Sequence, residues 1–114
     1  SPDPISELKR LIRLQRAYAH ANRGDELVTE KKIDEALKEY AAAGELAPEI
    51  LELPFWQAIT LTVVGRFDEA APIFTRVFEK EPYWADLVLR LPAAGQLPDD
   101  KALIDRIIAL RPKR

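Results

Sequence analysis

The sequence predicts an all-α protein built from two repeated helix hairpins. A small residue, an aromatic residue, a second small residue and a proline recur after 34 residues: Ala36, Tyr40, Ala43 and Pro48, then Ala70, Phe74, Val77 and Pro82. Apolar residues follow the 3.6-residue period of amphipathic helices, and prolines and glycines separate these stretches. A repeat of this length is typical of stacked helix-turn-helix units. We therefore expect a right-handed stack of antiparallel helix hairpins.

The first helix is predicted from Pro4 to about Glu30. The carboxylate of Asp3 can accept backbone N–H groups at the helix start, and proline suits the first turn because its missing donor costs nothing there. Apolar residues then fall along one side of the helix: Ile5, Leu8, Leu11, Ile12, Tyr18 and Ala19. Gly24 is expected to weaken the middle of the helix by about 1 kcal/mol relative to alanine.

Three further helices are predicted before residue 82. The second covers 33–46 and ends there because Pro48 excludes its predecessor from helical geometry. The third runs from about residue 49 or 53 to 64 and stops at Gly65. The fourth begins near Phe67 and is closed by Pro82. Its apolar side consists of Phe67, Ala70, Ala71, Phe74, Val77 and Phe78.

After Pro82 the repeat becomes irregular, because the segment 91–98 interrupts any helix. A short helix over 84–90 and a final helix over 99–110 are expected, the latter with a buried side of Leu103, Ile104, Ile107 and Ile108. We expect one domain over 1–114, with repeats at about 17–50 and 51–84 and a cap over 85–114. The extension 5–16 and the last helix would cover the two ends of the stack.

Composition excludes several classes of function. A net charge of −2 from 17 basic and 19 acidic residues gives no field that would attract nucleic acid. The chain has no cysteine, which excludes disulfides and zinc–thiolate sites. No apolar run is long enough to cross a bilayer, so no membrane partner is expected. The absence of methionine indicates that Ser1 is not the natural start and that the chain is a segment of a longer protein.

Residues 24–82 resemble two tetratricopeptide repeats. The matching residues are Gly24, Ala36, Tyr40, Ala43 and Pro48 in the first repeat and Gly65, Ala70, Phe74 and Pro82 in the second. The family has a large aromatic residue early in each first helix, where this chain has His20 and Pro54. The resemblance implies the helix-hairpin fold, and these two departures argue against a regular ligand groove.

Three short sequence segments resemble the carboxy-terminal domain of an uncharacterised bacterial family. They are Pro2-Asp3-Pro4-Ile5-Ser6-Glu7-Leu8, Phe55-Trp56, and the run from Tyr83-Trp84 through Arg90-Leu91-Pro92-Ala93-Ala94-Gly95. In that family an Ntn-hydrolase-like domain precedes a module named for peptidoglycan binding. The resemblance implies a non-catalytic module that binds the cell wall and lies in the cell envelope. The alternative is a protein-interaction or dimerisation module that docks the upstream enzyme-like domain without binding the wall.

The main candidate site is a row that we call the basic band: Lys9, Arg13, Arg16, His20 and Arg23. Spacings of 4, 3, 4 and 3 place these residues on one side of the first helix. Guanidinium groups bind carboxylates through paired hydrogen bonds, so the band could hold the carboxylates of peptidoglycan stem peptides or of a partner's carboxy terminus. The alternative is a solvated helix side or a docking surface for the upstream domain. His20 is the only histidine and is poor evidence for a metal site or a general base.

Trp84 and Arg90 are the second candidate region. A tryptophan face can stack on a sugar ring, although burial in a small core is the commoner role of a large aromatic residue. Arg90 borders the loop 91–98 and could bind either the loop carbonyls or a ligand. A loop that only caps the core is the structural alternative.

Catalysis has little support in the sequence. The acidic pairs Asp34-Glu35, Asp68-Glu69 and Asp99-Asp100 fall at predicted helix starts, where negative charge favours the helix dipole. Ser6 has no histidine or cysteine near it in the sequence, and the glycines form no phosphate-binding loop. We therefore expect a binding module without cofactor or metal, whose partner is peptidoglycan, a protein or a second copy of the chain.

Overall fold

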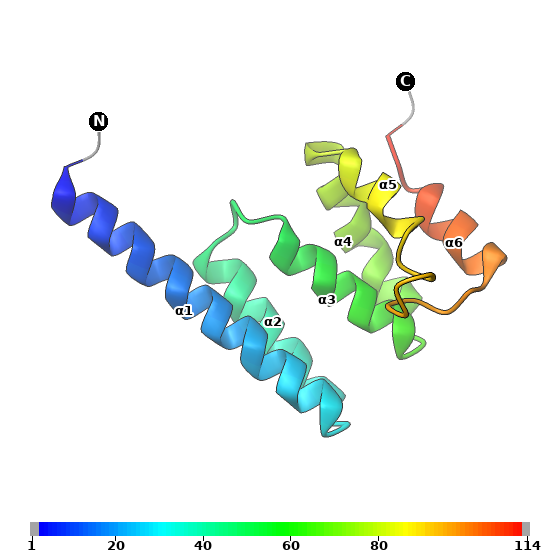
Figure 1. The fold of residues 1–114 in the computed structure, drawn as a ribbon, viewed down its shortest axis with the longest axis horizontal. Helices are drawn as coiled ribbons and strands as arrows, with labels where there is room; N and C mark the ends of the chain where they lie inside the picture. The colour runs from blue at the N-terminus through cyan, green and yellow to red at the C-terminus, as the bar shows by residue number, and fades with distance from the viewer. Residues whose placement is uncertain (1–2, 113–114) are drawn as a thin grey trace. The chain divides into compact units, whose positions relative to one another are not determined.

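The computed structural model describes residues 3–112, and these residues form six α-helices and no strand (Figure 1). The predicted all-α class is confirmed. The chain divides into two compact units, Ser1–Leu53 and Pro54–Arg114. The first unit holds helices α1 and α2 and the start of α3, and the second holds the rest of α3 and helices α4 to α6. In the described part of the chain, no helix has both the length and the apolar character needed to span a bilayer.

Helix α1 covers Pro4–Thr29 and begins as predicted. The backbone N–H of Ser6 donates to Asp3 Oδ1 at 2.8 Å, and the Ser6 hydroxyl donates to Asp3 Oδ2 at 3.0 Å. Asp3 therefore caps the helix, and its pKa lies below the ordinary value because of these bonds. A short turn follows, in which Lys31 adopts a φ of 65°.

Helix α2, Ile33–Leu46, returns alongside the later turns of α1 (Figure 1). The contact between the two helices is rich in alanine, whose small side chain lets the helices approach closely. The fully buried residues of the first unit are Ala17, Ala36, Ala43 and Ala47, joined by Leu27, Tyr40 and Leu53. Partly buried side chains complete the core: Leu14, Ala21, Val28, Leu37, Leu46 and Ile50.

The apolar side predicted for the first helix does not face this core. Ile5, Leu8, Leu11 and Ile12 are 67%, 57%, 50% and 48% exposed. Two observations explain this difference. Helix α1 has 26 residues and α2 only 14, so the first turns of α1 extend past the end of α2 (Figure 1). The contact with α2 instead uses the alanine-rich side of α1 through Ala17 and Ala21.

The second unit is built around aromatic residues. It contains most of α3 (Glu52–Val63) and all of α4 (Phe67–Lys80), α5 (Tyr83–Val88) and α6 (Lys101–Ile108). Phe55 on α3 lies with its ring centroid 6.1 Å from that of Phe74 on α4, edge to face, and Phe74 stacks on Phe78 at 5.5 Å. All three rings are fully buried. Aromatic pairs in this geometry stabilise a core beyond the area they bury.

The loop 91–98 closes this core, as the structural alternative for the loop predicted. Leu91 and Leu97 are buried, and the backbone N–H of Gln96 donates to the carbonyl of Leu91 at 2.9 Å. Gly95 adopts a φ of 78°, which glycine tolerates without strain. Asp100 then caps α6 by accepting the N–H of Leu103 at 3.2 Å. Helix α6 buries Ile104 and Ile107, two of the four residues predicted for its apolar side.

Helices α2 and α4 keep the repeat period. Each bound of α4 lies 34 residues after the corresponding bound of α2. The turn residues Lys31 and Gly65, also 34 positions apart, both have positive φ values, 65° and 86°. In the 34-residue period Gly65 therefore corresponds to Lys31. The position that corresponds to Gly24 is Ala58, which is fully buried.

Candidate binding surface on the first helix

The basic band divides into two sets in the structure. Arg13 and His20 make contacts within the first unit, on the side of α1 that faces α2. The other three residues, Lys9, Arg16 and Arg23, are exposed. The sequence placed all five on one side of the helix, but it did not indicate which of them would be engaged within the protein.

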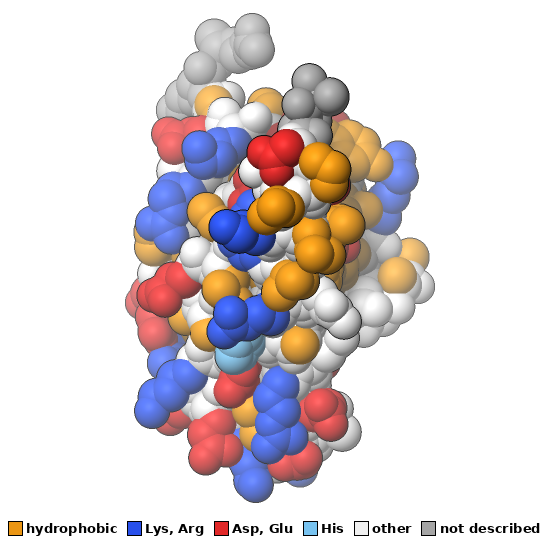
Figure 2. Space-filling view, turned by 90° about the vertical axis from the view of Figure 1, so that its left-hand side faces the viewer, with side chains coloured by type: hydrophobic (Ala, Val, Ile, Leu, Met, Phe, Trp, Pro, Cys, Tyr) orange, Lys and Arg blue, Asp and Glu red, His pale blue; other side chains and the backbone are white. Residues whose placement is uncertain are grey.

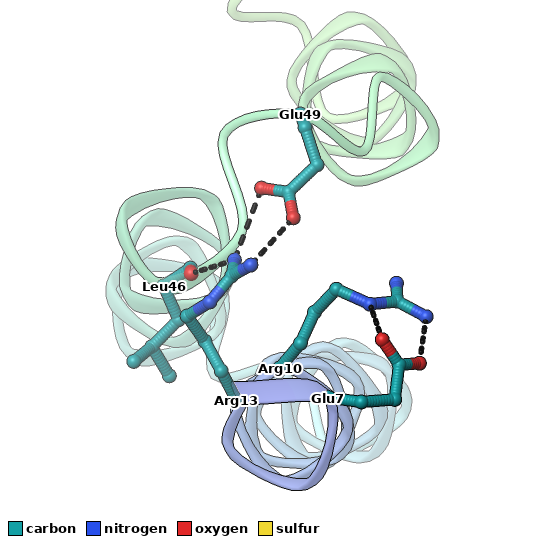
Figure 3. A network of polar contacts seen from close by, with 5 residues as sticks. All are labelled: Glu7, Arg10, Arg13, Leu46 and Glu49. Carbon is teal, nitrogen blue, oxygen red and sulfur yellow. Dashed lines mark hydrogen bonds and ion pairs between the residues drawn. The ribbon is translucent and has the colours of Figure 1, made fainter. Parts of the chain in front are cut away.

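Arg13 joins α1 to the end of α2 (Figure 3). Its Nη1 donates to the carbonyl of Leu46 at 2.9 Å and to Glu49 Oε1 at 3.0 Å, and its Nη2 lies 2.8 Å from Glu49 Oε2. The guanidinium thus binds the carboxylate through both oxygens and satisfies a carbonyl that the helix end leaves open. Arg13 therefore has a structural role within the first unit.

The Arg13–Glu49 pair also changes the ionisation of both groups. The hydrogen bond from Arg13 lowers the pKa of Glu49 below its ordinary value of 4.5. The same bond to Glu49 raises the pKa of Arg13. Both side chains remain partly exposed, at 38% for Arg13 and 49% for Glu49, so solvent screens the pair. Nearby, Arg10 binds Glu7 with Nη2 at 2.7 Å from Oε1, and this bond lowers the pKa of Glu7 (Figure 3).

His20 points toward α2 as well. Its Nδ1 lies 2.6 Å from Oε1 of Glu39, and both side chains are only partly exposed. A carboxylate can only accept a hydrogen bond, so Nδ1 carries the hydrogen in this contact. His20 is therefore held by the hairpin through its Nδ1.

Lys9, Arg16 and Arg23 form the open part of the band, and we call them the open cations. Among residues 3–112 the structure gives these three side chains no hydrogen bond and no ion pair. They remain available to bind an acidic group from outside.

The first turns of α1 add an apolar surface that the sequence interpretation did not assign to binding. Ile5, Leu8, Leu11 and Ile12, which we call the apolar stripe, are each about half exposed or more. Figure 2 shows hydrophobic side chains next to those of Lys and Arg, with Asp and Glu among them. Grouped apolar side chains at a surface mark interaction sites more often than scattered ones do. The signal in the sequence was the length of the first helix, which exceeds that of its partner.

Trp84 and Arg90 belong to the second unit. The Trp84 ring lies 4.8 Å from the Phe55 ring, centroid to centroid, and the side chain is half-buried. Trp84 therefore contributes to the aromatic core. Arg90 follows α5 and is exposed, and within residues 3–112 its side chain makes no hydrogen bond to the loop carbonyls. In the same unit, Arg106 stacks over the Phe67 ring with Cζ 4.4 Å from the ring centroid.

The acidic pairs lie at helix starts, as predicted. Asp34 and Glu35 occupy the first turn of α2, and Asp68 and Glu69 that of α4. Glu69 binds Arg66, with Nε 2.6 Å from Oε2. In the described residues no three His, Cys, Asp or Glu side chains gather in a way that could hold a metal ion.

Comparison of the chain with family models, curated proteins and solved structures finds no match.

Proposed function

We propose that this chain is a non-catalytic binding module that recognises a protein partner through the exposed side of α1. The observation that carries the proposal is the apolar stripe, where four large aliphatic side chains stay exposed on an ordered helix. A helix in water gains most of its stability from packing an apolar side against a neighbour. A partner that covers the stripe would supply this packing.

The family resemblance suggests which partner to test first. In the family that the chain resembles, an Ntn-hydrolase-like domain precedes the module, and that domain is the first candidate. Purified Ntn-hydrolase-like domain from a member of that family would be titrated with the 114-residue chain in a calorimeter. We expect a saturable complex.

The double variant Leu8→Gln/Ile12→Gln tests whether the stripe forms the contact. Glutamine favours helix as well as leucine does, and both positions are exposed, so the fold should persist. Loss of the complex in this variant, with an unchanged circular dichroism spectrum, supports the proposal. Lys38→Glu on the exposed surface of α2 is the control and should bind normally. A complex of equal strength in the double variant would contradict the proposal.

Peptidoglycan is the second candidate ligand. The open cations favour it, because three basic side chains without partners in the described chain can pair with carboxylates of stem peptides. The test is co-sedimentation with purified sacculi at low salt, where attraction between charges is strongest. No pelleting under these conditions removes the wall-binding candidate. Pelleting that the triple variant Lys9→Glu/Arg16→Glu/Arg23→Glu abolishes supports it.

We further propose that the hairpins α1–α2 and α3–α4 are tetratricopeptide-like repeats in a right-handed stack. The support is the 34-residue displacement between α2 and α4 and between the positive-φ residues Lys31 and Gly65. Residual dipolar couplings measured on all helices would give the orientation of one hairpin relative to the other. An orientation unlike that of neighbouring repeats would contradict the assignment.

A further inference from the structure

The exposed side of α1 has the heptad pattern of a helix that pairs with another helix. Positions at alternating spacings of three and four form a line along one side, which we call the α1 seam: Ile5, Leu8, Ile12, Gln15, Ala19 and Asn22. This is the a and d spacing of a coiled coil. Every residue of the seam is exposed, so the first unit itself does not cover it.

The seam changes in character along its length. Its first three residues are large aliphatic side chains, of which the least exposed, Ile12, is still 48% exposed. Its last three residues are polar or small, since Gln15 and Asn22 carry amide groups and Ala19 has only a methyl group. A partner on the seam would therefore make its strongest apolar contact with the first turns of α1, which extend past α2.

The open cations occupy a single border of this seam. Lys9, Arg16 and Arg23 follow one another at intervals of seven residues, each directly after a d position. In the heptad these are e positions, whose charges select the partner and its orientation. Three cations without partners in the described chain thus line one border of an uncovered surface whose first half is apolar. A partner surface that complements the seam would carry carboxylates along the border that faces these cations.

A second copy of the chain fits this border poorly. In an antiparallel pair related by a twofold axis, e positions face e positions, so the same three cations would oppose one another and repel. In a parallel pair each cation would face the g position five residues earlier on the other helix, and these positions are Pro4, Leu11 and Tyr18. None of those residues is acidic. The seam is therefore not complementary to itself.

An anionic membrane fits the surface less well than an acidic helix does. A helix that lies on a membrane has cations on both borders of its apolar side. Here the opposite border carries Tyr18, whose hydroxyl donates to the carboxylate of Glu52 at 3.0 Å. Glu26 continues the line of the seam itself and is exposed. These carboxylates would face anionic headgroups.

We infer that the partner of α1 is an amphipathic helix with apolar residues in heptad spacing and Asp or Glu along its flanks. This inference rests on the proposed function and names the chemistry of the partner at the same surface. The partner helix would lie along the α1 seam, with its apolar residues over Ile5, Leu8 and Ile12 and its carboxylates beside the open cations.

Two synthetic helical peptides test the inference. Both have three heptads with leucine at a and d, and they differ only at e and g, where one has glutamate and the other lysine. Neither peptide pairs well with itself, because its flanking charges repel. Fluorescence anisotropy would measure the binding of each labelled peptide to the full 114-residue chain. We expect the glutamate peptide to bind about tenfold or more tightly than the lysine peptide, with the difference falling as salt rises.

Variants of the chain make the test specific. Lys9→Glu/Arg16→Glu/Arg23→Glu should reverse the peptide preference, and Leu8→Gln/Ile12→Gln should weaken binding of the glutamate peptide about tenfold or more. Lys38→Glu reverses an exposed charge on α2 in the same way and should leave the preference unchanged. Circular dichroism establishes that each variant is folded.

Four results of the peptide, vesicle and association measurements would overturn the inference. The first is equal binding of both peptides, or of neither, by the folded chain. The second is a preference that survives the triple charge reversal. The third is a chain that sediments with phosphatidylglycerol vesicles and shows no preference between the two peptides. The fourth is a dimer of the chain that Leu8→Gln/Ile12→Gln abolishes.

The inference and the proposed function fail in different experiments. A complex with the Ntn-hydrolase-like domain that depends on Leu8 and Ile12 but not on the open cations overturns the inference and leaves the proposed function standing. The opposite result is a chain that binds the glutamate peptide but forms no complex with that domain. It supports the inference and removes that domain as the partner.

Discussion

The ring of Tyr40 occupies the space that a Cβ atom at position 24 would need. A Cβ built on Gly24 would lie 2.7 Å from ring carbon Cε1 and 2.9 Å from Cδ1. Tyr40 is buried, and its hydroxyl donates to Asp25 Oδ1 at 2.5 Å, so the ring is held at both ends. The close approach of α1 and α2 at this point depends on the absence of a side chain at position 24.

Gly24→Ala should destabilise the protein although alanine favours helix. The gain in helix propensity is about 1 kcal/mol, whereas forcing a methyl group against a fixed buried ring costs about 1 to 3 kcal/mol. We expect a net loss, measured as a lower free energy of unfolding in urea. Gly44→Ala is the matched control, since no heavy atom lies within 4 Å of a Cβ at that position. The control should gain about 0.5 to 1 kcal/mol. A stabilised Gly24→Ala variant would contradict this account.

Tyr40→Phe should destabilise the first unit by about 1 kcal/mol, because the hydrogen bond to Asp25 is lost while the ring is kept. Thermal unfolding followed by circular dichroism measures the change. Asp25→Ala removes the acceptor and is the companion variant, and the double variant should cost less than the sum of the two single changes. Additive effects would show that the hydroxyl and the carboxylate do not interact.

Arg13→Gln should lower the melting temperature, whereas Arg16→Gln should not. Arg13 binds Glu49 and the Leu46 carbonyl, while Arg16 is exposed without a side-chain partner among residues 3–112. Both variants remove one charge of the basic band, so the comparison isolates the contacts. Equal melting temperatures for the two variants would contradict the structural role of Arg13.

The Arg13 contact also predicts a pH dependence. The pKa of Glu49 lies below 4.5 when the carboxylate accepts from Arg13, and it should rise toward that value in Arg13→Gln. A carboxyl pKa that folding depresses stabilises the protein at neutral pH, and this contribution is lost as pH falls through the folded pKa. The difference in stability between the two proteins should therefore shrink below about pH 4.5. Carbon-13 NMR of the Glu49 carboxyl group measures the pKa directly.

Trp84→Ala should destabilise the second unit by about 2 kcal/mol, because it removes a half-buried ring that packs on Phe55. Tyr83→Ala, the neighbouring position, is the control, since Tyr83 is 53% exposed and should change stability little. Urea unfolding distinguishes the two. An unchanged stability in Trp84→Ala would free this residue for a role in ligand binding.

The sequence predicted the positions of the helices closely. The Asp3-Pro4 start, the Pro48 stop and the repeat period placed α1, α2 and α4 within a residue or two of their observed bounds. These signals act locally, through capping and proline geometry, so they can be recognised in a single sequence. The last helix was predicted over 99–110 and covers Lys101–Ile108; it starts later than predicted because Asp100 and not Asp99 forms its cap.

The orientation of α1 was harder to predict. Its large aliphatic residues form a regular stripe, and large aliphatic residues usually face a core. The core side of α1 is instead marked by alanine and glycine at positions 17, 21 and 24, whose role depends on the distance to α2. The candidate site was hard to predict for the same reason, because it depends on where α2 lies. The spacing of the basic band placed five residues on one side, but only the position of α2 shows that Arg13 and His20 are engaged with Glu49 and Glu39.

The unequal lengths of α1 and α2 have a consequence for the dynamics of the chain. The first turns of α1 have backbone hydrogen bonds but extend past α2, the other complete helix of the first unit, so their amide hydrogens should exchange with solvent much faster than those near Ala17. A ligand that settles on these turns would slow this exchange. Its affinity would then include the cost of ordering the end of the helix, which links recognition at this surface to the local folding of α1.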